Sequence, residues 1–477
     1  MPTRVEHDLL GDLPVPADAY YGVHTARALR NFAISGTRIG DFPEVVVALA
    51  SVKQAAAQAN RELGLLPDDV ADAIIAACQE IGQGRWHDQF VVDVVQGGAG
   101  TSTNMNANEV IANRALELLG HGRGAYAVVH PLDHVNASQS TNDVYPTAVK
   151  LALHLAVEEL LAAMDELRRA FAVKAEEFVD VLKLGRTQLQ DAVPMTLGQE
   201  FGAYAVTLGE DQDRLAEATA LLREINLGAT AIGTGINAHP HYAETVRARL
   251  SAITELDLIT APHLVEATSD VGVFVQLSGV LKRIAVKLSK TCNDLRLLSS
   301  GPTAGLNEIN LPAVQAGSSI MPGKINPVIP EVVHQIAFQV IGNDVTVTLA
   351  AEGGQLQLNA FEPVILAVLM QSLRHLREGC RTLTENCVRG ITANTGHLRE
   401  VVERSVGLVT ALSPAIGYEQ SSAIAAEALR TRRPVADLVL ERGLLDPADL
   451  ERLLSPANLV GPRRASSPTP DPDVSSS

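Results

Sequence analysis

One uninterrupted stretch limits the folds open to this chain more than any other feature. Residues 147–183 contain neither glycine nor proline, and their charged residues recur in clusters about one heptad or a few helical turns apart. This spacing places the charges on one stripe of a helix and Leu, Ala, Val and Phe on the remaining surface. The stretch therefore predicts one amphipathic helix, about 55 Å long at 1.5 Å per residue.

More long helical patterns follow, and most have apolar residues over a broad part of their surface. Helices of this kind are buried on most sides. Because they are longer than the radius of a single domain, we expect other copies of the chain to bury them. This predicts a mainly α fold whose helix bundle extends across a homo-oligomer, in preference to a monomeric helical array. The patterns lie at residues 197–225, 269–298, 330–351 and 361–391.

The regions on either side of these helices differ in composition. Residues 1–45 are rich in Gly and Pro and predict an irregular arm, and helices are expected at 45–63 and 68–79, separated by Gly64 and Pro67. We expect an N-terminal, mostly helical domain at 1–140, a central long-helix domain at 141–396, a small C-terminal helical domain at 397–462 and a disordered Ser/Pro-rich tail at 463–477.

Charge and cysteine usage exclude several classes of protein. Lys and Arg number 38 against 55 Asp and Glu, a net charge of −17, and no basic patch is present, which disfavours nucleic acid binding. No apolar run is long enough to span a membrane and no secretory signal begins the chain, so we expect a cytoplasmic protein. Four scattered cysteines without a CxxC pair predict reduced, buried thiols and no zinc site: Cys78, Cys292, Cys380 and Cys387.

Three loop-like regions concentrate small polar residues beside glycines. They are Gln96–Val110, His134–Thr147 (with Gly185–Pro194 after the long helix), and Ala316–Glu331. Each precedes a helical stretch, so backbone N–H groups and the helix dipole can point at an anion. Hydroxyls, amides and one lysine, Lys324, suit a ligand with carboxylates. Taken singly, the same residues are also typical of helix caps and turns.

The last of these regions carries the strongest signal. Gly317–Pro327 forms a long loop with both flexible and stiff points, which is typical of an active-site lid. Ser318 and Ser319 begin it, but no GxSxG motif surrounds them, so a hydrolase triad is not supported. The chain also lacks dinucleotide-binding and P-loop motifs.

Four segments resemble the conserved segments of the aspartase/fumarase superfamily. They are GTSTNMNANEV (100–110), HVNASQSTND (134–143), GRTQLQDAVPMTLGQE (185–200) and GSSIMPGKINP (317–327). They occur in the expected order, and the resemblance extends from about Val5 to Pro462. It implies a mostly helical subunit of three domains, whose central helices form a tetrameric core, with each active site built from segments of three subunits.

Within this superfamily the chain resembles the aspartase branch most. Segments such as LNEINLPAVQAGSSIMP and AAEGGQLQLNAFEPVI carry that similarity. Class II fumarases typically have His where this chain has Gln188, whereas Gly323 and residues 130–136 look equally fumarase-like. The resemblance therefore implies reversible elimination of ammonia from L-aspartate, with hydration of fumarate to L-malate as the alternative. An inactive scaffold of the same fold is a third hypothesis, although the expected contact residues are all present.

The resemblance also implies a role for each residue at the site. Ser318 would be the base that removes the Cβ proton, and Asn142 would contact the ammonium group. No redox cofactor is implied; Mg²⁺ activates some aspartases, but no ligand cluster in the sequence identifies a site. The β-carboxylate would be held by Thr101, Ser140, Thr141 and Ser319, and the α-carboxylate by Thr187, Lys324 and Asn326.

Overall fold

The computed structural model describes residues 2–317 and 319–461. The predicted base, Ser318, and the predicted disordered tail lie outside the described residues. The chain forms two compact units, and several of the long helices contribute residues to both. Unit 1 comprises Met1–Asp165, Glu210–Ser289 and Val332–Cys380; unit 2 comprises Glu166–Gly209, Lys290–Glu331 and Arg381–Ser477.

Unit 1 begins with a feature that the sequence analysis missed. Strands β1 (Thr3–Asp8) and β2 (Gly11–Pro16) form an antiparallel hairpin, and helix α1 (Val23–Asn31) follows it. The prediction of an irregular arm was therefore wrong over these residues. Alternating burial explains the hairpin, because Leu13 and Val15 of β2 are buried while their neighbours face outward. Gly11, at φ +103°, makes the tight turn possible.

The remaining helices of the N-terminal half follow the expected order. The two predicted short helices are α2 (Pro43–Glu62) and α3 (Asp68–Gly82), and α4 (Thr101–Leu118) begins inside the first polar region. Short elements complete this part of unit 1: the parallel pair β5 (Glu224–Ile225) and β6 (Ile259–Thr260), α7 (Tyr242–Thr254) and α8 (Leu264–Ser269).

The long helices confirm a mainly α fold. The longest helix is α5, which spans Thr141–Glu177, so it begins and ends six residues before the predicted range. Pro146 lies close enough to its start to be accommodated, which the prediction did not allow. The other long helices lie within a few residues of their predicted bounds: α6 (Leu197–Ala220), α9 (Gly272–Leu298), α10 (Val328–Glu352) and α11 (Glu362–Asn386).

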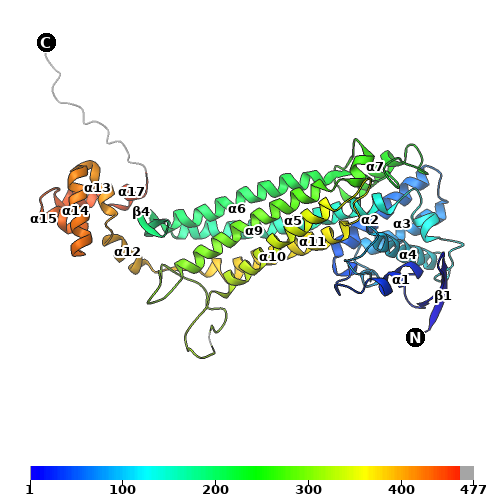
Figure 1. The fold of residues 1–477 in the computed structure, drawn as a ribbon, viewed down its shortest axis with the longest axis horizontal. Helices are drawn as coiled ribbons and strands as arrows, with labels where there is room; N and C mark the ends of the chain where they lie inside the picture. Colours follow the sequence, from blue (N-terminus) through cyan, green and yellow to red (C-terminus); the bar gives the residue numbers. More distant parts are fainter. Residues whose placement is uncertain (1, 318, 462–477) are drawn as a thin grey trace, which may run out of the picture. The chain divides into compact units, whose positions relative to one another are not determined.

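Within unit 1, α9, α10 and α11 lie side by side (Figure 1). Asp344 of α10 accepts a 2.8 Å hydrogen bond from Ser278 and pairs with Lys282, both on α9. On its other side, Asn343 donates to Ser372 of α11 at 3.0 Å. These polar contacts help to fix the register of three helices that otherwise pack largely through apolar side chains.

Unit 2 contains a hairpin and a group of short helices. Strands β3 (Leu182–Thr187) and β4 (Gln190–Thr196) pair antiparallel, and β7 (Ile309–Asn310) pairs with β8 (Thr392–Ala393). The small helices share an apolar core that includes Leu412, Ile424 and Val439. They are α12 (Thr395–Glu403), α13 (Leu408–Ile416), α14 (Tyr418–Thr431), α15 (Val435–Glu441), α16 (Pro447–Leu453) and α17 (Pro456–Leu459).

Candidate functional site

The first polar region places Thr101 at the start of α4. Gly98, Ala99 and Gly100 all have positive φ angles, and this left-handed run turns the chain sharply into the helix. A Cβ at Gly100 would lie 2.4 Å from the ring of Tyr145 on α5, so only glycine allows the two helices to approach this closely. Thr101 is exposed, and its hydroxyl donates to the carbonyl of Gly98 at 2.7 Å.

The second polar region lies beside the first. Thr141 and Asn142 form the beginning of α5, Ser140 lies immediately before it, and all three are half-buried. Asn104, one turn along α4 from Thr101, donates to the hydroxyl of Thr141 at 3.0 Å. Unit 1 therefore brings these two predicted regions together, at two neighbouring helix N-termini that offer hydroxyls and backbone N–H groups to an anion.

A fully buried lysine lies beneath these residues. The Lys53 ammonium donates to the side-chain oxygens of Asn136 and Gln139, both at 2.9 Å. Asn136 also accepts from Asn104, at 3.2 Å. Burial lowers the pKa of Lys53 to about 7, against a smaller opposing effect of Asp143. Lys53 thus ties α2 to the segment immediately before α5.

Sequence analysis did not identify Lys53, although a signal was present. It is a single charge within the otherwise Ala/Val-rich helix LASVKQAAAQAN. A lysine in such a run is buried only at a cost, so the pattern pointed to a specific acceptor elsewhere in the chain. Which acceptor, however, depends on a contact between residues more than eighty positions apart.

The third polar region, in unit 2, forms a closed loop. The Gly317 N–H donates to the carbonyl of Lys324 at 3.1 Å, and Asn326 Nδ2 donates back to the carbonyl of Gly317 at 2.5 Å. Ser319 and Lys324 are exposed, and Asn326 is half-buried. Two hydrogen bonds therefore hold the ends of the loop together, while Lys324 and Ser319 are exposed to solvent.

Unit 2 also places Thr187 at a hairpin end. Gln188 and Leu189, at φ +54° and +62°, form the two-residue turn between β3 and β4, which is typical of a hairpin of this geometry. The exposed Thr187 and Gln188 follow a buried group of charges. Glu308 lies 2.8 Å from Lys183 and 2.5 Å from Arg186, which anchors β3 immediately before Thr187.

The predicted site residues are thus divided between the two units. Thr101, Ser140, Thr141 and Asn142 belong to unit 1, where they lie close together. Those in unit 2 are Thr187, Ser319, Lys324 and Asn326. Each group is held by hydrogen bonds within its own unit.

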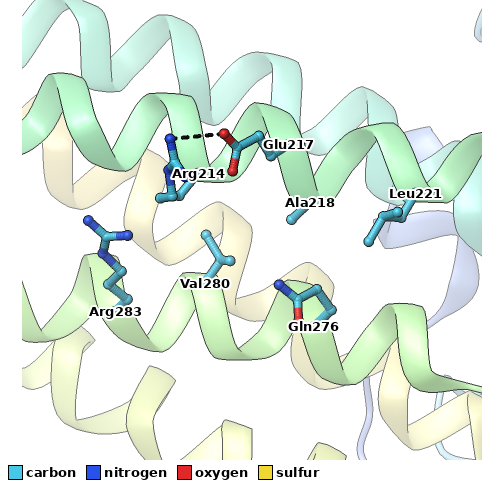
Figure 2. Close-up of a pocket in the computed structure, with 7 residues that line it drawn as sticks. All are labelled: Arg214, Glu217, Ala218, Leu221, Gln276, Val280 and Arg283. Carbon is cyan, nitrogen blue, oxygen red and sulfur yellow. Dashed lines mark ion pairs between the residues drawn. The ribbon is translucent and has the colours of Figure 1, made fainter.

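Other features of the molecule lie apart from these residues. A groove of about 280 Å³ in unit 1 lies between α6 and α9 (Figure 2) and is lined by none of the predicted site residues. Its Arg214 and Glu217 form an ion pair at 2.9 Å. Within residues 2–317 and 319–461, no group of three or more His, Cys, Asp or Glu could hold a metal ion. In the same part of the chain, no helix is long and apolar enough to cross a membrane. All four cysteines are buried, as expected.

Comparison with known proteins supports a single family. Residues 11–342 match a family model described as lyase, and residues 408–461 match one described as fumarase C C-terminus. An aspartate ammonia-lyase of Pseudomonas aeruginosa is 61% identical over 462 residues, which cover 97% of this chain and 98% of that protein. An aspartate ammonia-lyase of Escherichia coli K12 is 55% identical over 96% of each chain.

Two solved structures match nearly the whole chain. A fumarate lyase:delta crystallin from Brucella melitensis, bound to cobalt, has a TM-score of 0.95 and 56% identity, and the match covers 97% of this chain and 100% of that one. A class II fumarase from Schistosoma mansoni has a TM-score of 0.91 but only 35% identity, with the same coverage.

Proposed function

This chain belongs to the lyase family that includes the aspartate ammonia-lyases and the class II fumarases, and from this we infer that it eliminates ammonia from L-aspartate to form fumarate, reversibly. It is a carbon–nitrogen lyase. The observation that carries this conclusion is the identity of 55–61% with aspartate ammonia-lyases over nearly the full chain. The matched class II fumarase is markedly more distant, at 35%.

The difficult step in this reaction is removal of a proton from Cβ. The electron pair left on that carbon is delocalised into the β-carboxylate, which becomes an enediolate with additional negative charge on its oxygens. Fixed hydrogen-bond donors at that position supply the largest stabilisation available to the enzyme. We propose that the donors are Thr101, Ser140, Thr141 and Ser319. Thr101 and Thr141 begin α4 and α5, and Ser140 immediately precedes α5, so the helix dipoles also favour negative charge there.

The α-carboxylate and the amino group need different partners. We propose that Lys324, Asn326 and Thr187 bind the α-carboxylate, and that Asn142 accepts a hydrogen bond from the ammonium group. The exposed ammonium of Lys324 supports this assignment, because a lysine among hydroxyls and amides is a suitable counter-charge for a carboxylate.

For the base we propose Ser318, which lies outside the described residues. A serine hydroxyl is a weak base at neutral pH, so its alkoxide would need stabilisation by loop N–H groups and by Lys324 in a site closed to water. Glycine at position 317 supports a tightly closed loop, since a Cβ there would lie 2.3 Å from the carbonyl of Lys324.

We also propose that the chain works as a homotetramer, with active sites shared between three subunits. An apolar stripe on α10 supports this assembly. Phe338, Val345 and Leu349 are 64%, 57% and 65% exposed, at spacings of seven and four residues. The opposite face of the helix is buried, so α10 carries two apolar faces and only one of them is covered within the chain.

Three further assignments complete the proposal. Elimination of ammonia transfers no net electrons, so the reaction requires no redox cofactor, and we propose that it requires no metal ion either; activation by Mg²⁺, as in some aspartases, is a question for chelation experiments. Four scattered, buried cysteines in a chain of 477 residues support a reducing compartment, for which we propose the cytoplasm. The division into domains at 1–140, 141–396 and 397–462 also stays a prediction.

Product analysis tests this function directly. Purified protein incubated with L-aspartate should release fumarate and ammonium in equal amounts, followed by ultraviolet absorbance and by an ammonium assay. Ser318→Ala should reduce turnover by at least about 100-fold, because general base catalysis alone contributes roughly that factor. Near-normal turnover in Ser318→Ala would falsify the assignment of the base. Absence of both products would contradict the proposed reaction.

A further inference from the structure

The side chain of Asn142 is oriented by a hydrogen bond to the backbone. Its Nδ2 donates to the carbonyl of Ala231 at 2.7 Å. A carbonyl oxygen only accepts, so this contact requires the NH₂ group on that side, and it directs Oδ1 away from Ala231. Asn142 is half-buried, and Oδ1, on the side of the amide away from Ala231, is the atom available to a ligand.

The backbone of Asn142 is held by a second contact. Pro146, four residues along α5, has no N–H, so the carbonyl of Asn142 lacks its usual helical donor. Asn226, which is fully buried, supplies the missing donor: its Nδ2 bonds to that carbonyl at 3.0 Å. Pro146 thus leaves the carbonyl of Asn142 open to an amide from a distant part of the chain.

The next residue of α5 attaches the same turn from the other side. Asp143 is fully buried, and one of its carboxylate oxygens accepts the N–H groups of Gly228 and Thr230 at 3.1 and 3.0 Å. Its other oxygen accepts the N–H of Ser140 at 3.0 Å. The side chains of Asn142 and Asp143 on α5, together with that of Asn226, therefore join residues 226–231 to the start of α5. We call residues 226–231 the amide clamp.

The amide clamp has an unfavourable backbone conformation. Thr230 and Ala231 are consecutive non-glycine residues with φ angles of +43° and +36°. Such conformations are costly, most of all for a β-branched residue, and persist only where the surroundings enforce them. Here the hydroxyl of Thr230 donates to the carbonyl of Ile236 at 2.9 Å, and its N–H is held by Asp143. The strain thus lies at Ala231, whose carbonyl accepts a hydrogen bond from Asn142, and at Thr230 immediately before it.

We propose that the amide clamp is a positioning device, which supports binding of an amine by holding Asn142 Oδ1 toward the amino group of the substrate. This proposal rests on the function proposed above. An ammonium group can only donate hydrogen bonds, so it needs an acceptor at this position. A hydroxyl or a water molecule can donate or accept, so it would bind to either orientation of the amide. The orientation fixed by Ala231 therefore matters most for the nitrogen substrate.

Kinetics in the direction of ammonia addition isolate this role, because fumarate has no amino group. Thr230→Val keeps the shape of the side chain but removes the bond to Ile236. We expect its KM for ammonia to rise about three- to tenfold, the range for loss of one hydrogen bond, while its KM for fumarate stays within about twofold. Thr230→Ser, which keeps the hydroxyl, should restore the KM for ammonia.

A matched variant controls for loss of a hydroxyl elsewhere. Thr245→Val on α7 removes the same kind of bond, from Thr245 to the carbonyl of His241 at 2.8 Å, and should change neither KM. A rise in both KM values for Thr230→Val, or in neither, would overturn the proposal. Wild-type protein that adds no ammonia to fumarate would instead refute the proposed function, and the role of the amide clamp with it.

Discussion

Adding a single methyl group at Gly317 should disable the loop without unfolding the protein. A Cβ at this position would lie 2.3 Å from the carbonyl oxygen of Lys324 and 2.6 Å from the N of Asn326. Ordinary van der Waals contact begins at 3.4 Å, so the two sides of the loop must separate by about 1 Å. The two hydrogen bonds that close the loop, from Gly317 N–H and to the Gly317 carbonyl, would lengthen with it.

The expected cost in catalysis follows from this displacement. A misplacement of about 1 Å in a catalytic group typically costs about 100-fold in rate. We therefore expect kcat/KM of Gly317→Ala for L-aspartate to fall about 100-fold, which corresponds to about 2.7 kcal/mol of transition-state stabilisation. The melting temperature should change little, because this loop is largely exposed and adds few contacts to the core.

Steady-state kinetics and thermal unfolding of the same preparation measure both quantities. Gly82→Ala is the matched control, since a Cβ there has no neighbour within 4 Å and the residue lies at the end of α3. It should keep full activity. If Gly317→Ala retains activity within about threefold of the wild type, the close contact between Gly317 and residues 324–326 does not position the catalytic groups, and the reasoning is wrong.

Three other perturbations test separate parts of the structure. Burial raises the pKa of Glu362 from 4.5 to about 8, so the folded state favours the protonated carboxyl. The stability that this protonated carboxyl contributes is fully present below pH 4.5 and is lost as the pH rises through about 8. Relative to Glu362→Gln, the free energy of unfolding of the wild type should fall by up to about 5 kcal/mol over that range, measured by denaturant titration; parallel curves would contradict it. Phe338→Glu should shift the proposed tetramer to smaller species in size-exclusion chromatography, whereas Tyr418→Glu, at a residue 84% exposed on α14, should not; an assembly of unchanged size would mean that α10 is not an interface. Dialysis against a chelator should leave turnover of saturating L-aspartate unchanged, and loss that Mg²⁺ restores would show a required metal.

The long helices were predictable because their sequence patterns are local. A 3.6-residue period over six or more turns is a strong signal, and the bounds of α9, α10 and α11 differ from their predicted ranges by only a few residues. The hairpin of β1 and β2 escaped because its prolines suggested a loop, yet Pro14 and Pro16 lie in a two-stranded sheet, where an unpaired edge tolerates them.

The site was predictable only in part. Hydroxyls and amides beside glycines indicated an anion site, and the family resemblance supplied the roles. The groups that hold those residues in place escaped because their contacts join distant positions: Lys53 meets Asn136, and Asn226 meets Asn142. No local pattern encodes such pairs. A positive φ at Thr230 runs against its β-branched side chain, so propensity alone could not indicate it.

The most direct test of the account compares two substrates with one preparation of the protein. Formation of fumarate is followed by its ultraviolet absorbance in separate assays with L-aspartate and with L-malate, and kcat/KM is determined for each. The account predicts fumarate from L-aspartate, with kcat/KM for L-malate at least about 100-fold lower, since the chain is 55–61% identical to aspartate ammonia-lyases but only 35% identical to the matched class II fumarase. Equal or faster reaction of L-malate would identify a fumarase and contradict both the proposed function and the role given to Asn142.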